Sequence, residues 1–263
     1  MTLFPGVALI TGAASGIGRA TALSFAREGC RKLALADLNT SGLEETAKAI
    51  HEAATDGDVR VVTIETDVSE EGQVEGMVER TVRELGRVDY AVNAAGILTT
   101  PHRSHDLSPR DFDHINAINY RGCWLSSRAE IAQMRQQEPL DTHDGRPGNR
   151  GAVVNVASQL GIVGRSEAAA YCASKAAVIS MTRCDAIDYS KDNIRVNCIC
   201  PGVIDTPMTR PNMTFLSPAI SLAPLNRPGT AQEIADAVLF LASPKASFVQ
   251  GAAMVVDGGY TIN

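Results

Sequence analysis

The sequence predicts an α/β fold in which a parallel sheet carries helices on both of its faces. Hydrophobic runs alternate with amphipathic segments from one end of the chain to the other, which is typical of β–α–β units. The runs are rich in Val, Ile, Leu and Ala, as expected of strands buried on both faces. A chain of 263 residues with 44% hydrophobic content can build one large core, so we expect a single domain spanning residues 1–263.

The hydrophobic runs are predicted to be strands and the segments between them helices. Several of these helices follow a Ser, Thr or Asp, the residue types that favour a helix N-cap. The predicted strands span residues 6–11, 32–37, 60–66, 89–93, 152–157, 195–200 and 253–256. The predicted helices include residues 17–28, 43–53, 71–85, 111–136, 168–189 and 231–242.

Two segments interrupt this alternation. Residues 136–150 are polar and contain two prolines, so we expect a surface loop. Residues 205–228 contain five prolines, which rules out one regular helix over this segment. Long loops of compact domains are usually lids or binding loops, and we expect residues 205–228 to form a substrate lid.

Composition and charge exclude several classes of protein. The net charge is -6 and the basic residues are scattered, which argues against a nucleic-acid partner. No apolar stretch approaches the ~20 residues of a membrane span, and the first residues do not form a basic leader with a cleavage site. The six cysteines show no CxxC and no disulfide-framework spacing, so we expect a reducing, cytoplasmic setting.

A glycine-rich segment follows the first predicted strand. It reads TGAASGIG from Thr11, with glycines at positions 12, 16 and 18, and it leads into a helix. Such glycines let the backbone turn sharply and approach a pyrophosphate at the helix N-terminus. A tight strand-to-helix turn with no ligand would also favour glycine, so this pattern alone is weak.

The end of the second predicted strand supports the dinucleotide interpretation. Asp37 stands about 20 residues after the last glycine, where a carboxylate can accept hydrogen bonds from an adenosine ribose. The alternative interpretation is that Asp37 is an ordinary cap of the following helix. The glycines and Asp37 together predict a dinucleotide site that favours NAD.

The segment Tyr171-Cys-Ala-Ser-Lys175 opens a predicted helix, so its Tyr and Lys lie one turn apart on the same face. A nearby ammonium favours phenolate, which brings the pKa of a Tyr closer to the range of an acid/base catalyst. Ser158 follows the fifth predicted strand and could hold the reacting oxygen beside Tyr171. The alternatives are a Tyr stacked on a Lys stem and a Ser that caps a turn.

These motifs resemble those of the short-chain dehydrogenase/reductase family along essentially the whole chain. The resemblance also includes Asn93-Ala-Ala-Gly96 in place of the usual NNAG, an Asn at position 119, Pro201-Gly202, and Val256-Asp-Gly-Gly259. It implies a Rossmann-type, doubly wound parallel sheet of seven strands in the order 3-2-1-4-5-6-7. It also implies a homo-oligomer, either a dimer or a tetramer.

Carried over residue by residue, the resemblance implies a catalytic group of Asn119, Ser158, Tyr171 and Lys175. Tyr171 is the acid/base, and Asn119 holds a water that relays protons from Lys175. Lys175 also binds the nicotinamide ribose and lowers the pKa of the phenol. The cofactor-binding residues implied are Gly12, Ser15, Gly16, Ile17, Gly18, Asp37, Asp67, Val68, Asn93, Ala94, Gly96, Tyr171, Lys175, Pro201, Gly202, Ile204 and Thr206.

Other candidate residues are not assigned a chemical role. His102 and His105 share an HxxH spacing, but no further ligands complete a set, so we predict no metal site. Cys198 and Cys200 alternate on a predicted strand and share a face, which favours a place in the core over a redox pair.

The sequence thus predicts an NAD(H)-dependent oxidoreductase that transfers a hydride between nicotinamide and a secondary alcohol or ketone. The apolar residues of segment 205–228 favour a hydrophobic, cyclic substrate, and the polar insert at 136–150 is similar to that of fungal members acting in secondary metabolism. Two alternatives stay open: an NADPH-dependent ketoreductase, and a member of the fold that acts as an isomerase or cyclase without redox chemistry.

Overall fold

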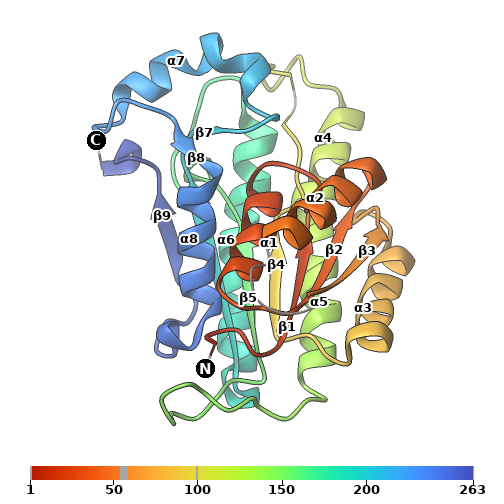
Figure 1. Cartoon of the computed structure of the whole chain (residues 1–263). Coiled ribbons are helices and arrows are strands. Elements are labelled where there is room, and N and C mark those ends of the chain that lie inside the picture. The colour runs from red at the N-terminus through yellow and green to blue at the C-terminus, as the bar shows by residue number, and fades with distance from the viewer. Residues whose placement is uncertain (1, 54–58, 99, 263) are drawn as a thin grey trace.

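The computed structural model describes residues 2–53, 59–98 and 100–262. Seven parallel strands form one sheet in the order β3-β2-β1-β4-β5-β6-β9, which confirms the predicted order (Figure 1). The last strand is the ninth because two short strands, β7 and β8, pair with each other outside this sheet. The strands are β1 Val7–Thr11, β2 Lys32–Asp37, β3 Arg60–Glu65, β4 Tyr90–Asn93, β5 Gly151–Val156, β6 Ile194–Pro201, β7 Ile204–Asp205, β8 Gly229–Thr230 and β9 Ala253–Val256.

Helices cover both faces of the sheet, because successive strand side chains point to opposite faces. In β1, Ala8 and Ile10 pack with α1, α2 and α8, whereas Val7 and Leu9 pack with α3, α5 and α6. The helices are α1 Gly16–Arg27, α2 Thr40–Ala53, α3 Glu71–Leu85, α4 Pro109–Asn116, α5 Cys123–Met134, α6 Ala169–Tyr189, α7 Met213–Leu222 and α8 Ala231–Ala242.

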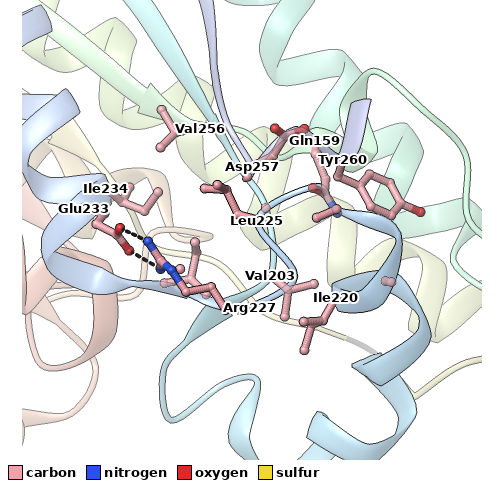
Figure 2. A pocket seen from close by; sticks show the side chains of 16 residues that line it. Gln159, Val203, Ile220, Leu225, Arg227, Glu233, Ile234, Val256, Asp257 and Tyr260 are labelled. Carbon is pink, nitrogen blue, oxygen red and sulfur yellow. Dashed lines mark hydrogen bonds and ion pairs between the residues drawn. The ribbon is translucent and has the colours of Figure 1, made fainter. Parts of the chain in front are cut away.

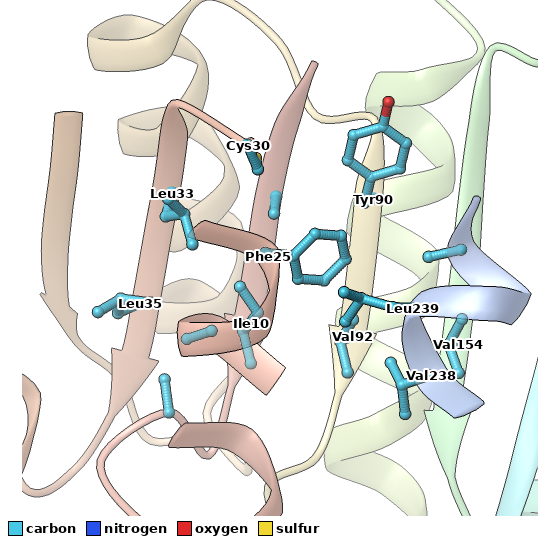
Figure 3. Close-up of a cluster of buried hydrophobic side chains, with 14 of the residues drawn as sticks. Ile10, Phe25, Cys30, Leu33, Leu35, Tyr90, Val92, Val154, Val238 and Leu239 are labelled. Atoms are coloured by element: carbon cyan, nitrogen blue, oxygen red, sulfur yellow. The ribbon is translucent and has the colours of Figure 1, made fainter. Parts of the chain in front are cut away.

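An aromatic group closes the core beneath α1 and α8. The rings of Phe4, Phe25 of α1 and Tyr90 contact one another, at centroid distances of 4.9 Å (Phe4–Phe25), 5.2 Å (Phe4–Tyr90) and 5.8 Å (Phe25–Tyr90). Figure 3 shows Phe25 and Tyr90. Such pairs add stability beyond the area they bury. They hold α1, and therefore the glycine-rich turn before it, against the sheet.

The carboxyl ends of the central strands meet along one edge of the sheet. Thr11 at the end of β1 lies in register with Asn93 of β4, and Asn93 lies in register with Asn155 of β5. Ligands of open parallel sheets bind outside this edge, where neighbouring connections diverge. The register therefore gathers the segments that follow β1, β4 and β5 at one place.

The prediction of one continuous helix over residues 111–136 is wrong. The structure has α4, then a π-helical segment Ala117–Gly122, then α5. Single π-helical turns within helices often mark functional sites. Here the wider turn contains Asn119, whose side chain is bonded to the backbone of Ile97.

The segment 205–228 is not one regular helix, as predicted, but it does contain the ten-residue helix α7. Pro218 lies inside this helix and contributes no backbone N–H donor. Leu216 is buried against the body of the protein, whereas Phe215 is half exposed. Within the described residues, none of the helices has the length and apolar character needed to cross a bilayer.

Candidate active site

The glycine-rich turn after β1 leaves no room for side chains. A Cβ on Gly12 would lie 2.8 Å from the carbonyl carbon of Ala94, and one on Gly18 would lie 2.1 Å from the carbonyl oxygen of Gly12. Gly12 also has a φ of +69°, a left-handed conformation that favours glycine. The glycines are therefore needed for close backbone approach, and their spacing fits a phosphate cradle.

A cleft opens directly beside this turn. It runs from the turn past the ends of β2, β3 and β4 to the start of segment 205–228, and its narrow glycine side fits a dinucleotide. Its lining includes these predicted cofactor residues: Gly12, Ser15, Gly16, Ile17, Gly18, Asp37, Asp67, Val68, Ala94, Gly96 and Thr206.

The Asp37 side chain is held in place by two backbone N–H groups. The N–H groups of Ala14 and Asn39 donate to its two carboxylate oxygens at 3.1 and 3.0 Å. Each carboxylate oxygen can accept a second hydrogen bond, so Asp37 keeps capacity for ribose hydroxyls. Its position thus serves both interpretations made from the sequence, a cap of the next helix and a ribose acceptor.

Asn93 does not line the cleft, in contrast to the role that the resemblance implies. Its Nδ2 donates to Ser127, Glu130 and Asn155 at 2.9 to 3.2 Å, within a fully buried cluster. Burial raises the pKa of Glu130 to about 8, so this carboxyl is largely protonated at neutral pH. Asn93 therefore supports the cleft from beneath, through the position of its strand.

A second cavity, which we call the substrate cavity, adjoins the cleft. Ser158, Tyr171 and Lys175 line it, together with Pro201, Gly202 and Ile204. The two spaces share six lining residues and so form one continuous crevice. The shared residues are Ile17, Ala94, Gly96, Ile97, Thr206 and Met208.

The side chains of Ser158 and Tyr171 lie next to each other in this cavity. They share a side-chain hydrogen bond, and the Ser158 hydroxyl also accepts from the backbone N–H of Leu160 at 3.1 Å. Lys175 lies one turn after Tyr171, with its Nζ 5.9 Å from the Tyr171 ring centroid. That Nζ donates to the carbonyl of Val156 at 2.8 Å. The three side chains expected to act together are therefore brought together.

The pKa of Tyr171 differs from the expectation made from the sequence. Burial raises it, and the hydrogen bond with Ser158 and the charge of Arg165 only partly offset that effect. Burial also lowers the pKa of Lys175. The phenol in this structure is thus a proton donor at neutral pH, because desolvation outweighs the neighbouring cations.

Asn119 lies behind Lys175 and does not line the cavity. Its Oδ1 accepts from the N–H of Ile97 at 2.8 Å, and its Nδ2 donates to the carbonyl of Ile97 at 3.0 Å. A Cβ on Gly96 would lie 3.1 Å from this Oδ1 and 3.6 Å from the Nζ of Lys175. Gly96 thus lets the Asn119 amide and Lys175 approach each other.

Four polar side chains of the substrate cavity were not predicted from the sequence: Gln159, Arg165, Thr209 and Tyr260. Gln159 and Tyr260 also line a further cavity, beside β7 (Figure 2). An ion pair between Arg227 and Glu233 forms another part of its wall. Gln159 could have been considered because it follows Ser158 directly. Arg165 and Tyr260 stand in no motif that would have identified them.

Comparisons with known proteins match this geometry over nearly the whole chain. Residues 12–261 match the family model described as enoyl-(acyl carrier protein) reductase. The chain is 39% identical to the short-chain dehydrogenase fogB of Aspergillus ruber, over 98% of this chain and 97% of that protein. The chain belongs to the short-chain dehydrogenase/reductase family. Dehydrogenases of this family use nicotinamide cofactors, in agreement with the cleft.

Two other family members are similar to this chain. It is 40% identical to cyclopentanol dehydrogenase of a Comamonas species, over 98% of this chain and 97% of that protein. The crystal structure of levodione reductase superposes with a TM-score of 0.88 at 38% identity, with 98% of each chain covered. The short-chain dehydrogenase/reductase fold expected from the motifs is thereby confirmed.

Proposed function

We propose that the protein is an NAD(H)-dependent oxidoreductase that interconverts a hydrophobic, cyclic secondary alcohol and its ketone, with Tyr171 as the acid/base. The observation that carries this proposal is the pairing of Ser158 with Tyr171 in a cavity continuous with the glycine-lined cleft. The similar proteins include a cyclopentanol dehydrogenase and a levodione reductase, whose names support a cyclic substrate.

The residues divide the chemistry as follows. A bound nicotinamide supplies or accepts the hydride. Ser158 holds the substrate oxygen, and Tyr171 donates a proton to it during ketone reduction or removes one during alcohol oxidation. Lys175 holds positive charge beside the phenol, and Asn119 positions the proton relay behind Lys175. The rim of apolar residues from segment 205–228 excludes water.

Binding of the dinucleotide is assigned to the cleft. The turn formed by Gly12, Gly16 and Gly18 would hold the pyrophosphate together with Ser15 and Ile17, and Asp67 and Val68 would contact the adenine. Ala94 and Gly96 would line the adenosine side. The nicotinamide would lie against Pro201, Gly202, Ile204 and Thr206, with Lys175 on its ribose.

The preference for NAD over NADP rests on charge. A 2'-phosphate would face the Asp37 carboxylate, and Ser15 provides no compensating cation. Of the basic residues near Ser15 and Asp37 in sequence, Arg19 pairs with Glu45 at 3.4 Å. Lys32 begins β2, whereas Asp37 ends it, which separates the two by about 16 Å of extended chain.

We also propose that the protein is a homo-oligomer. Large apolar side chains stay exposed on α4, the π-helical segment, α5 and α6, among them Phe112, Tyr120, Trp124 and Ile187. Surfaces of this kind usually mark protein contacts. Light scattering at micromolar concentration should give a dimer or tetramer, and a monomer alone would contradict this assignment.

Turnover of a panel of cyclic ketones and alcohols, followed by nicotinamide absorbance with NAD(H) and NADP(H), tests the proposed function. We expect ketone reduction to persist through neutral pH and alcohol oxidation to rise with pH, because the raised pKa of Tyr171 favours the protonated phenol. Equal or higher kcat/KM with NADPH would favour an NADPH-dependent ketoreductase. No redox turnover with any compound would favour an isomerase or cyclase.

A further inference from the structure

Arg165 is a cation of the substrate cavity that forms no ion pair within the described part of the chain. It lies in the loop before α6 and lines the same cavity as Ser158 and Tyr171. Its charge lowers the pKa of Tyr171, so the guanidinium acts directly on the reacting end of the cavity. Its Nε is buried without a hydrogen-bond partner among the described residues. A buried donor of this kind is costly unless a ligand satisfies it.

The surroundings of Arg165 offer no anion. The described residues that line the cavity include neither Asp nor Glu, and the ion pairs formed in the described chain do not involve Arg165. Most other lining side chains are apolar, and besides Arg165 the charged residue among the described lining is Lys175, whose Nζ donates to the carbonyl of Val156. The apolar lining includes Ile97, Leu98, Leu160, Met208, Leu216 and Ala219.

The fold nevertheless holds the guanidinium in place. Its central carbon lies 5.7 Å from the ring centroid of Phe215, which belongs to α7 in the segment that covers the cavity. A cation over an aromatic ring is attracted to it, but the ring leaves the positive charge uncompensated. Arg165 is thus fixed between the catalytic phenol and the covering helix without a neutralising partner.

We propose that Arg165 binds a carboxylate of the substrate, so that the substrate is a cyclic hydroxy acid or keto acid with its reacting carbon at Tyr171. This inference rests on the proposed function. A guanidinium can form two parallel, charge-assisted hydrogen bonds with a carboxylate, which supplies both affinity and orientation. Gln159, only 4% exposed, lines the same cavity, and its amide Nε2 can donate a hydrogen bond to the same group.

The test compares an acidic and a neutral ketone of similar shape: 4-oxocyclohexanecarboxylate and 4-methylcyclohexanone. We expect the unmodified protein to favour the acid in kcat/KM by about tenfold or more, since charge-assisted bonds are strong. Arg165→Met should lower kcat/KM for the acid by about 10- to 100-fold more than for the neutral ketone, mainly through KM. The ratio of the two substrates cancels any effect of Arg165 on the pKa of Tyr171.

Two further variants serve as controls. Arg83→Met removes an exposed positive charge from α3, far from the cavity, and should leave the ratio unchanged. Arg165→Lys keeps a charge but loses the planar fork, so it should retain part of the preference for the acid. Thermal melting of each variant shows whether it is folded, and Arg165→Lys provides the comparison if Arg165→Met does not fold.

A binding measurement separates this inference from the proposed reaction. Calorimetric titration with cyclohexanecarboxylate and with the neutral cyclohexanecarboxamide should show tighter binding of the acid, and Arg165→Met should abolish that difference. If Arg165→Met changes neither the ratio of kcat/KM nor the binding difference, the carboxylate site is refuted. Reduction of the neutral ketone would then still support the proposed function. Conversely, an Arg165-dependent binding preference without any ketone reduction would support the site and contradict the reaction.

Discussion

The two halves of the crevice are built in different ways. The cleft beside α1 is shaped by main-chain atoms: a Cβ on Gly18 would lie 2.1 Å from the carbonyl oxygen of Gly12. The substrate cavity is shaped by side chains from segments far apart in the sequence, including Ser158, Arg165, Leu216 and Tyr260. The glycine turn of the cleft therefore selects its ligand by the shape of the backbone, whereas the substrate cavity selects its ligand by the size, polarity and charge of its side chains.

This difference teaches where change can be tolerated. A substitution at the glycines displaces backbone and therefore disturbs β1, α1 and the cleft together. A substitution in the substrate cavity replaces one lining group and leaves the sheet intact. The glycine turn should thus fail as a unit, whereas single side chains of the cavity, and of the cleft at Asp37, should each have a separate effect.

The largest expected effect comes from the reacting side of the cavity. Tyr171→Phe removes the proton donor but keeps the ring, so kcat should fall by about 10²- to 10⁴-fold. NADH should bind as before, which fluorescence titration measures. The matched control is Tyr189→Phe on the same helix and outside the cavity, which should leave kcat within about twofold. A Phe variant with near-normal turnover would falsify the assignment of Tyr171.

On the cofactor side, Asp37→Arg should reverse or strongly narrow the preference for NAD. The change replaces repulsion of a 2'-phosphate with attraction, and each ~1.4 kcal/mol corresponds to a tenfold change in preference. We expect the ratio of kcat/KM for NADH to that for NADPH to fall by about 10- to 100-fold.

Asp37→Asn removes the negative charge at this position without adding a cation. The amide keeps one acceptor oxygen, so it can accept from the N–H of Ala14 or of Asn39 but not from both, because these bond to different oxygens of Asp37. It should shift the cofactor ratio in the same direction as Asp37→Arg, by a smaller factor. A ratio unchanged in both variants would show that Asp37 does not select the cofactor.

The same division explains what the sequence could predict. The strand order was predicted correctly through the family resemblance that the motifs carry. The glycines of the turn were found because Gly12 and Gly18 stand where only glycine fits, and their role toward a cofactor stays a prediction. The motif of Asn93 lies at the strand end, but its side chain lies in the buried cluster with Glu130, which no local pattern indicates, and its assignment to the cofactor stays a prediction. Arg165 was missed because its role depends on contacts with Phe215 and Tyr171, and no local pattern encodes those contacts.

A smaller effect is expected where the covering helix touches the cavity. Phe215→Leu keeps an apolar side chain but removes the ring beneath the Arg165 guanidinium. Cation–π contacts at partly exposed sites contribute about 0.5–1 kcal/mol, so KM for an acidic ketone should rise about two- to fivefold. Phe112→Leu, at a similarly exposed ring on α4, is the control and should leave KM unchanged. An equal rise of KM for acidic and neutral ketones would indicate that Phe215 acts on the covering helix alone.

The smallest effect on turnover is expected from Glu130, which lies beneath both halves and lines neither space. Its carboxyl is buried, and its pKa is raised from 4.5 to about 8 by that burial. The unfolded chain ionises Glu130 near 4.5, so the folded state binds one proton more between these pH values. The free energy of unfolding should therefore fall by about 1.4 kcal/mol per pH unit over this interval, apart from other groups.

Glu130→Gln keeps an acceptor for Asn93, cannot ionise, and should remove this slope while leaving kcat and cofactor affinity unchanged. Urea unfolding at pH 5.5, 6.5 and 7.5 measures it against Glu79→Gln, an exposed change on α3. A loss of cofactor affinity in Glu130→Gln would mean that the buried cluster around Glu130 affects cofactor binding in the cleft. The cleft and the substrate cavity would then both depend on this cluster.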